Sequence, residues 1–289
     1  MNNRINLQRE AARSALQLRR SRSIPREHPV NVYDLAAATG VQVQFLDLPS
    51  LEGMFYRGPD PKIFLPSLNH RSRGRVSFTC AHELGHFQLG HGTRVDEYLD
   101  SPEVSEPKSD DEIAADTFAS TLLMPRPAVL KRFECRGISL ESASPADLFI
   151  ASCELDVGYS TLLNHLRFGL QLVDDEWLVG RKNVAPKFIR ENLAGVSDVR
   201  RVVVVDEHWA PVPIDLEVGD YVVVPEGAQL KPEQFLDSVG VRGAYRSLKA
   251  VRPGQCTIRI GDSAPIVRIA RAGFIGLFQY RFFEEVESE

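Results

Sequence analysis

The sequence changes character near Leu172, and this change restricts the chain to a fold in two parts. Before this point apolar residues recur at helical spacing. After it, short β-branched runs such as VRRVVVVD and PIVRIAR are separated by Gly, Pro and Asp turns. At 289 residues the chain is long enough for two domains. We therefore predict an α+β fold: a first domain over residues 1–172, a linker with one short helix over 173–197, and a β-rich sandwich or barrel over 198–289.

The first domain is predicted to combine helices with a small sheet. Helical patterns over residues 5–20 and in VNVYDLAAATG precede strand patterns in VQVQFLDL and GMFYRGPDPKIFLP. The strand around Lys62–Leu65 is expected to form an exposed edge that pairs with an extended substrate. A buried helix is predicted from Arg75 to Leu89. After an acidic loop, a second helix runs from about Asp111 to Leu123, where two prolines stop it.

The motif HELGH, from His82 to His86, lies inside the uninterrupted apolar run VSFTCAHELGHFQL. Residues four apart stand one above the other on a helix, so the imidazoles of His82 and His86 can hold one metal ion. Glu83 then lies beside the open position of the metal. The alternative is that both histidines are hydrogen-bonded core residues, but the motif would then bring three polar groups to one buried helix. We therefore predict a zinc site with Glu83 as the general base.

A catalytic zinc keeps three protein ligands and one water, so a third ligand must come from elsewhere in the chain. His91 does not fit the three-histidine pattern HExxHxxGxxH, because the chain has Leu89 and Gly92 where Gly and His are required. Glu112 is the better candidate, since it opens the second helix. Asp116 follows four residues later on the same face, where it can orient a zinc-bound imidazole.

Two alternatives for the third ligand remain open. Ser109 and Glu112 also fit a capping box, in which Glu112 only satisfies a backbone amide. Glu106 is a second candidate ligand, although it lies between prolines in the acidic loop. The spacing identifies no oxyanion donor. His91, Tyr56 and Tyr98 are candidate contacts to the substrate or to a developing oxyanion, with the alternative that the aromatic residues of the small sheet are core residues.

RGRVSFTCAHELGH followed by EIAADTFASTLLMP resembles the ImmA/IrrE family of zinc-dependent metallopeptidases. VYDLAAATGVQVQF and LDVGYSTLLNHLRFGL resemble the flanking segments of that family. The resemblance covers approximately residues 10–172. The chain departs from the family pattern at two positions: Asp116 stands where family members often have Asn, and Cys80 stands where an aliphatic residue is common. The resemblance implies a zincin-like fold in which Glu83 is the general base and zinc is held by His82, His86 and Glu112.

The resemblance also implies a function. Members of this family are regulatory endopeptidases that cleave a specific protein partner, a transcriptional repressor with a helix-turn-helix domain, in stress, mobile-element or phage-related responses. Two other functions remain open: a non-catalytic zinc protein that sequesters a regulator, and a toxin-like protease restrained by a cognate partner. The β-rich region is expected to sense a signal, recruit the substrate or restrain the active site, unless it only stabilises or dimerises the chain. No residue pattern specifies the oligomeric state.

The composition of the chain limits where in the cell we expect the protein and what it binds. No run approaches the roughly 18 apolar residues of a membrane span, and the basic N-terminus lacks the apolar stretch of a secretory signal, so we expect a cytoplasmic protein without membrane contact. The four cysteines form no CxxC pair and are interpreted as reduced thiols. A net charge of -5 does not favour non-specific nucleic-acid binding. The N-terminal segment carries seven arginines: Arg4, Arg9, Arg13, Arg19, Arg20, Arg22 and Arg26. They are interpreted as a docking face for an acidic partner or for a nucleic-acid trigger. The alternative is that they form a solvated helix face.

Overall fold

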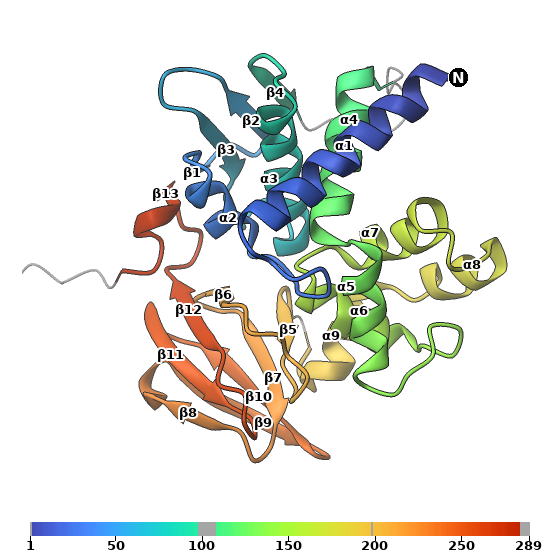
Figure 1. Ribbon diagram of the computed structural model, residues 1–289. Helices are drawn as coiled ribbons and strands as arrows, with labels where there is room; N and C mark the ends of the chain where they lie inside the picture. Colours follow the sequence, from blue (N-terminus) through green and yellow to red (C-terminus); the bar gives the residue numbers. More distant parts are fainter. Residues whose placement is uncertain (1, 98–107, 198, 284–289) are drawn as a thin grey trace, which may run out of the picture. The chain divides into compact units, whose positions relative to one another are not determined.

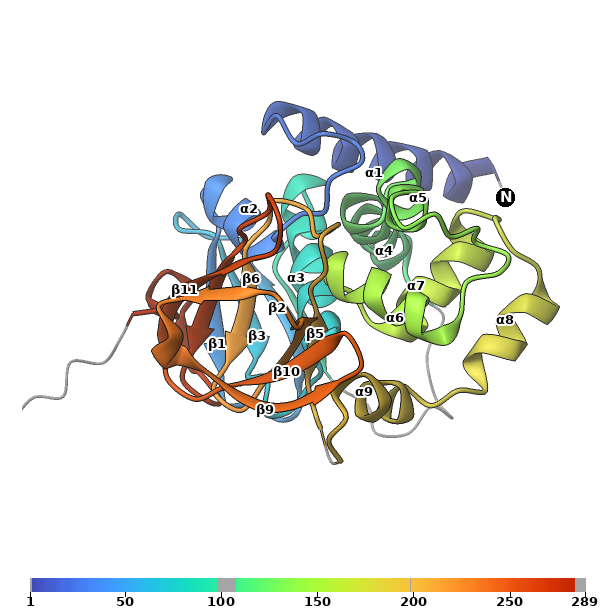
Figure 2. The same cartoon turned by 90° about the horizontal axis from the view of Figure 1, so that it is seen from below.

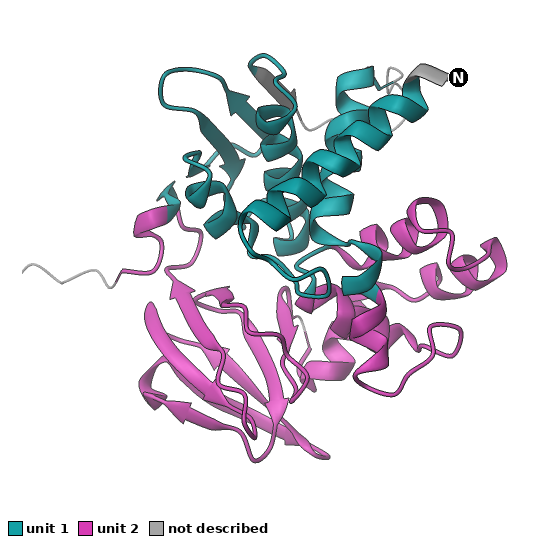
Figure 3. Cartoon of the chain, viewed as in Figure 1, with its two compact units in different colours: residues 1–129, 155–157, 275–278 teal, residues 130–154, 158–274, 279–289 magenta. Residues whose placement is uncertain are grey.

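The computed structural model describes residues 2–97, 108–197 and 199–283. Over these residues the protein is a mixed α+β structure with several small sheets (Figures 1 and 2). The chain divides into two compact units (Figure 3). Unit 1 consists of Met1–Val129, Leu155–Val157 and Ile275–Phe278. Unit 2 consists of Leu130–Glu154, Gly158–Phe274 and Gln279–Glu289.

Unit 1 combines a five-stranded sheet with helices. The strand order is β13-β1-β3-β2-β4, with β1 parallel to β3 and the other neighbours antiparallel. The helices are α1 (Asn2–Ser21), α2 (Val32–Ala38), α3 (Arg73–Gln88), α4 (Asp110–Leu123) and the start of α5 (Arg126–Glu134). The strands are β1 (Gln42–Leu46), β2 (Leu51–Tyr56), β3 (Lys62–Pro66), β4 (Arg94–Glu97) and β13 (Gly276–Leu277).

Strand β3 lies in the middle of this sheet. Ile63 is paired with Val43 of β1 on one side and with Phe55 of β2 on the other. The prediction that Lys62–Leu65 offers a free edge to a substrate is therefore wrong, because neighbouring strands occupy both of its edges. The two outermost strands of the sheet order are β4 and β13.

Helix α3 packs on β2 and β3 with one face and on α4 with another (Figures 1 and 2). Ala81 and Leu84 are fully buried. Gly85 allows the close approach of α4, because a Cβ at this position would stand 3.1 Å from Phe118 Cδ1 and 3.3 Å from the Cα of Ala115. The missing side chain thus brings the first turns of α4 close to the end of α3 that carries HELGH.

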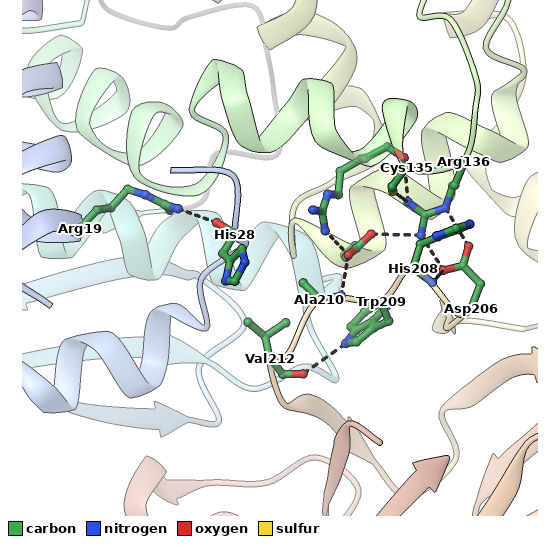
Figure 4. A network of polar contacts seen from close by, with 11 residues as sticks. Arg19, His28, Cys135, Arg136, Asp206, His208, Trp209, Ala210 and Val212 are labelled. Atoms are coloured by element: carbon green, nitrogen blue, oxygen red, sulfur yellow. Dashed lines mark hydrogen bonds and ion pairs between the residues drawn. The ribbon is translucent and has the colours of Figure 1, made fainter. Parts of the chain in front are cut away.

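Arg19 holds helix α1 in place. Arg19 is 2% exposed, and its guanidinium donates hydrogen bonds to the carbonyl oxygens of Leu122 (2.7 Å) and Pro25 (2.8 Å). It also donates to the carbonyl oxygen of His28 (Figure 4). Burial lowers the pKa of Arg19 to about 10, against the raising effect of the Glu27 charge. Arg19 therefore does not belong to a docking face, and this part of the prediction is wrong.

Unit 2 contains the remaining helices and two four-stranded sheets. The sheet orders are β5-β7-β10-β9 and β6-β12-β11-β8. The helices are α6 (Pro145–Glu154), α7 (Tyr159–Asn164) with a π-helical turn (His165–Gly169), α8 (Asp175–Lys182) and α9 (Pro186–Ala194), and two 3-10 turns follow at Glu233–Phe235 and Phe278–Tyr280. The strands are β5 (Val202–Val204), β6 (Ile214–Glu217), β7 (Tyr221–Pro225), β8 (Gln229–Lys231), β9 (Leu236–Arg242), β10 (Tyr245–Ala250), β11 (Gly254–Arg259) and β12 (Ile266–Ala270).

The two sheets of unit 2 share one hydrophobic core. Val222 and Leu248 come from one sheet, and Ile258 and Val267 come from the other. All four are fully buried. The expected β-rich C-terminal region is therefore present, with a hydrophobic core to which both sheets contribute.

The boundaries of the two compact units differ from the predicted domain boundaries. Residues 158–172 belong to unit 2, whereas β13 belongs to unit 1. The segment 173–197, expected to carry one short helix, contains both α8 and α9. The division into a peptidase domain and a regulatory domain stays a prediction.

A buried network of charges joins α5, α6 and the segment that follows β5 (Figure 4). Glu154 of α6 forms ion pairs with Arg132 and Arg136 and accepts a hydrogen bond from the Ala210 amide (2.9 Å). Arg136 also forms a two-pronged pair with Asp206, at 2.7 Å for each contact. Because buried charges are costly unless they are paired, this network fixes the segment that follows β5 against α5 and α6.

All four cysteines are free, in agreement with the prediction of reduced thiols. Among the described residues, no helix combines the length and the apolar character that crossing a membrane requires.

Candidate metal centre

His82 and His86 lie one turn apart on α3, and both are buried. Their Nε2 atoms are 3.1 Å apart, and their ring centroids are 4.9 Å apart at an angle of 65°. The helix periodicity thus turns the Nε2 atoms of both imidazoles toward one point, as the motif predicts.

Glu112 approaches the same point from the first turn of α4. Its Oε2 lies 3.0 Å from His82 Nε2, and its Oε1 lies 3.4 Å from His86 Nε2. The Ser109 side chain caps the helix by accepting a hydrogen bond from the Glu112 amide at 3.3 Å. The capping interaction therefore involves the backbone of Glu112 and leaves its carboxylate beside the two histidines. The hydrogen bond with His82 lowers the pKa of Glu112, against the opposing effect of burial.

These three residues fit a zinc ion. Each of them offers a ligand atom, and the three atoms all lie within 4.8 Å of one another. Tetrahedral zinc with bonds of about 2.0–2.2 Å holds its ligand atoms roughly 3.3 Å apart, which is close to the separations described above. Two imidazoles and one carboxylate are also a donor set of catalytic zinc sites.

Asp116 orients His82 from the same face of α4 as Glu112. Its Oδ1 lies 3.0 Å from His82 Nδ1, and its Oδ2 accepts a hydrogen bond from Lys108 Nζ. Burial alone would lower the pKa of His82, but hydrogen bonds with Asp116 and Glu112 and the charge of Glu83 raise it to about 10. A cation that binds at His82 Nε2 must therefore displace a firmly held proton.

The Glu83 side chain is fully buried and lies against β2. A Cβ at Gly53 would stand 2.5 Å from Glu83 Oε1 and 2.5 Å from the Thr79 methyl group. Gly53 is a site residue that the sequence reasoning missed. Its signal was a glycine inside the strand pattern LEGMFY, which often marks a close approach to a backbone.

The three expected substrate contacts have different surroundings. His91 lies beside His86, with its Nδ1 2.8 Å from His86 Nδ1. Tyr56 ends β2 and is 41% exposed. Tyr98 lies outside the described residues, as does the alternative ligand Glu106. Their roles as substrate contacts stay predictions. Two further neighbours that the sequence reasoning missed are Arg57 and Asp111, which both contact His91.

Residues 36–157 match the family model of peptidase M78, the IrrE N-terminal-like domain. The matched segment contains all three candidate ligands together with Glu83. A comparison with curated proteins finds no match to the chain. The family match confirms the resemblance drawn from HELGH and EIAADTFASTLLMP. Residues 36–157, which carry the candidate metal centre, are thus the part of the chain that is similar to the IrrE N-terminal-like domain of peptidase M78.

Proposed function

We propose that the protein is a zinc-dependent endopeptidase that hydrolyses a peptide bond in a specific protein partner. The observation that carries this proposal is the convergence of His82, His86 and Glu112 from two helices within a segment of a peptidase family. Three protein ligands leave one position for water or substrate, which is the arrangement of catalytic rather than structural zinc.

The proposed chemistry assigns a task to each neighbouring side chain. Zinc, when bound, polarises the scissile carbonyl and makes a water molecule more acidic. Glu83 would accept a proton from the attacking water as the water oxygen bonds to the scissile carbonyl carbon, and would deliver it to the amine that leaves when the C–N bond breaks. Gly53 leaves the space in which the Glu83 carboxylate lies. Asp116 accepts the Nδ1 proton of His82 and keeps Nε2 directed toward the other two ligands.

An extended substrate segment fits the edge of the sheet at β4. This strand is the outer neighbour of β2, which carries Gly53, and it ends the sheet order on that side. Backbone groups of an edge strand can pair with a peptide, and this replaces the edge that was expected at Lys62–Leu65. We propose β4 as the strand that receives the substrate.

The partner that we propose is a transcriptional repressor with a helix-turn-helix domain, cleaved in the cytoplasm during a stress, mobile-element or phage-related response. The family match supports the peptidase, and the partner follows from the resemblance to ImmA/IrrE proteins. A nucleic acid is the proposed trigger, and exposed arginines of α1 such as Arg9 and Arg13 are its candidate contacts. Cleavage of the partner with and without single-stranded DNA tests the trigger.

The proposal is tested by co-incubation of the full chain with a candidate substrate, the helix-turn-helix protein whose gene lies nearest to its own. Zinc content is measured by elemental analysis, and the products are measured by mass spectrometry. We expect stoichiometric zinc and one cleavage position. In Glu83→Gln zinc should remain while the rate falls about a hundredfold or more, because the general base is lost. Glu134→Gln, an exposed position on α5, is the matched control.

Two other outcomes would change the assignment. If Glu83→Gln keeps the biological output, the function is sequestration of a regulator by a zinc-containing protein. If the chain is toxic to cells and a cognate partner suppresses this toxicity, the same chemistry serves a toxin-like protease. A chain that binds no zinc would overturn the proposal.

A further inference from the structure

The two ring nitrogens of His86 face different groups. Its Nε2 lies near His82 Nε2 and Glu112 Oε1, at 3.1 and 3.4 Å. Its Nδ1 lies 2.8 Å from His91 Nδ1. Each ligand histidine thus has a partner at its remote nitrogen: Asp116 for His82 and His91 for His86.

The contact between His86 and His91 results from the way α3 ends. Leu89 is the C-cap residue of α3, and Gly90 follows it in the left-handed conformation with φ +80°. The His91 amide donates to the His86 carbonyl at 3.0 Å, and the Gly90 amide donates to the Phe87 carbonyl at 3.2 Å. This pair of bonds is a Schellman motif, which brings the second residue after the cap back against the last turn. Here it brings one imidazole against another.

Two further groups hold His91. The Arg57 guanidinium donates to the His91 carbonyl at 2.6 Å and to the Phe87 carbonyl at 2.9 Å, and it lies over the rings of Phe55 and Phe87. On the far side of the His91 ring, Nε2 lies 3.5 Å from Asp111 Oδ1. Asp111 directly precedes Glu112 on α4, so the helix that supplies the third ligand also supplies this carboxylate.

We propose that His91 is a positioning residue for His86 and that Asp111 holds it in that role. The inference rests on the proposed zinc binding. If His86 uses Nε2 as a ligand, its Nδ1 carries the ring proton and donates a hydrogen bond to Nδ1 of His91. His91 must then carry its own proton on Nε2, facing Asp111. The contacts therefore assign one tautomer to each ring. They also mean that His86 is held in place by the pair of His91 and Asp111.

The first measurement is the zinc dissociation constant of the full chain, obtained by competition with a chelating dye. His91→Leu removes the acceptor and should weaken zinc binding roughly tenfold or more, as loss of such supporting groups commonly does. His91→Asn places an amide oxygen near the position of the lost nitrogen and should recover most of the affinity. His70→Leu is the control, because His70 also pairs with a carboxylate, Asp47, away from α4.

The second measurement identifies the tautomers. In zinc-loaded protein, ¹H–¹⁵N correlations of the imidazole rings should show His91 protonated at Nε2 and not at Nδ1. Asp111→Ala should weaken zinc binding, whereas Asp110→Ala, an exposed partner of Arg4 in the same helical turn, should not.

The outcomes separate this inference from the proposed function. Wild-type protein that binds no zinc would overturn both. Wild-type protein that binds zinc while His91→Leu binds it equally well would overturn the positioning role alone. A His91 ring protonated at Nδ1 in the zinc-loaded protein would also overturn it.

Discussion

Gly53 of β2 lies so close to Glu83 of α3 that a single methyl group at Gly53 would overlap the Glu83 carboxylate. The strand thus sets the position of the proposed general base through the side chain that it lacks. Substitutions at this point should separate catalysis from metal binding, because the three candidate ligands come from α3 and α4 and not from β2.

Gly53→Ala should lower kcat by about tenfold or more, since a misplaced catalytic group loses much of its effect. Zinc content should remain stoichiometric. The measurements are the rate of partner cleavage and elemental analysis of the same sample. Gly92→Ala is the control, because a Cβ there meets nothing within 4 Å. A fully active Gly53→Ala enzyme would contradict the assigned position of Glu83.

Zinc binding should release a proton from His82 even at pH 8. The pKa of this histidine is raised to about 10 in the absence of metal, so the ring is charged at pH 8 and must become neutral to act as a ligand. Calorimetry in buffers of different ionisation enthalpy counts the released protons. Asp116→Asn should reduce the count, because it removes a hydrogen bond that favours the charged ring.

The same raised pKa gives a stability prediction for metal-free protein. Its contribution to the free energy of unfolding is complete below pH 6.5 and is lost as the pH rises toward about 10. Denaturant titrations at several pH values measure this loss. If Asp116→Asn shows the wild-type pH profile and the wild-type proton release, the carboxylate does not set the pKa of His82.

Excess zinc should raise the melting temperature, because a ligand that binds only the folded state stabilises it by about 2.7 kcal/mol at one hundred times its Kd. Glu112→Ala should lose this shift, whereas Glu106→Ala should keep it. Thermal unfolding with and without zinc provides the measurement. The reverse pattern would assign the third ligand to Glu106.

Arg19→Ala should destabilise the folded state by about 3 kcal/mol, because a charged donor is lost and buried carbonyl groups lose a partner. Arg19→Lys should recover only part of this, since an ammonium group lacks the planar fork that reaches several acceptors. Arg13→Ala on the exposed face of α1 should change the free energy of unfolding by less than about 0.5 kcal/mol. Equal effects at positions 13 and 19 would contradict the anchoring role of Arg19.

Local patterns were sufficient to predict which candidate site residues share a face of each helix. The spacing of four residues puts His82 and His86 on one helix face, and the same spacing puts Glu112 and Asp116 on another. What the pattern could not give was the contact between the two helices, which depends on the close approach at Gly85. The contact between His86 and His91 was not predicted either, because it depends on the fold-back of the chain at Gly90, which adopts a left-handed conformation after α3.

Strand pairing was the least predictable part of the fold. Alternating residues in Lys62–Pro66 indicate a strand but carry no information about its neighbours, so a central strand was assigned to an edge. The two-residue strand β13 has too little pattern to be recognised at all. Its position beside β1 arises from long-range packing that no local spacing encodes.

Strand β13 also has a consequence for synthesis of the protein on the ribosome. Gly276 and Leu277 pair with Phe45 and Gln44, so the sheet of unit 1 cannot be completed until the chain has been translated through Leu277. A nascent chain released early leaves β1 with an open edge, which is the kind of edge that promotes aggregation. Completion of the sheet in unit 1 is thereby coupled to synthesis of the β-rich region that precedes β13.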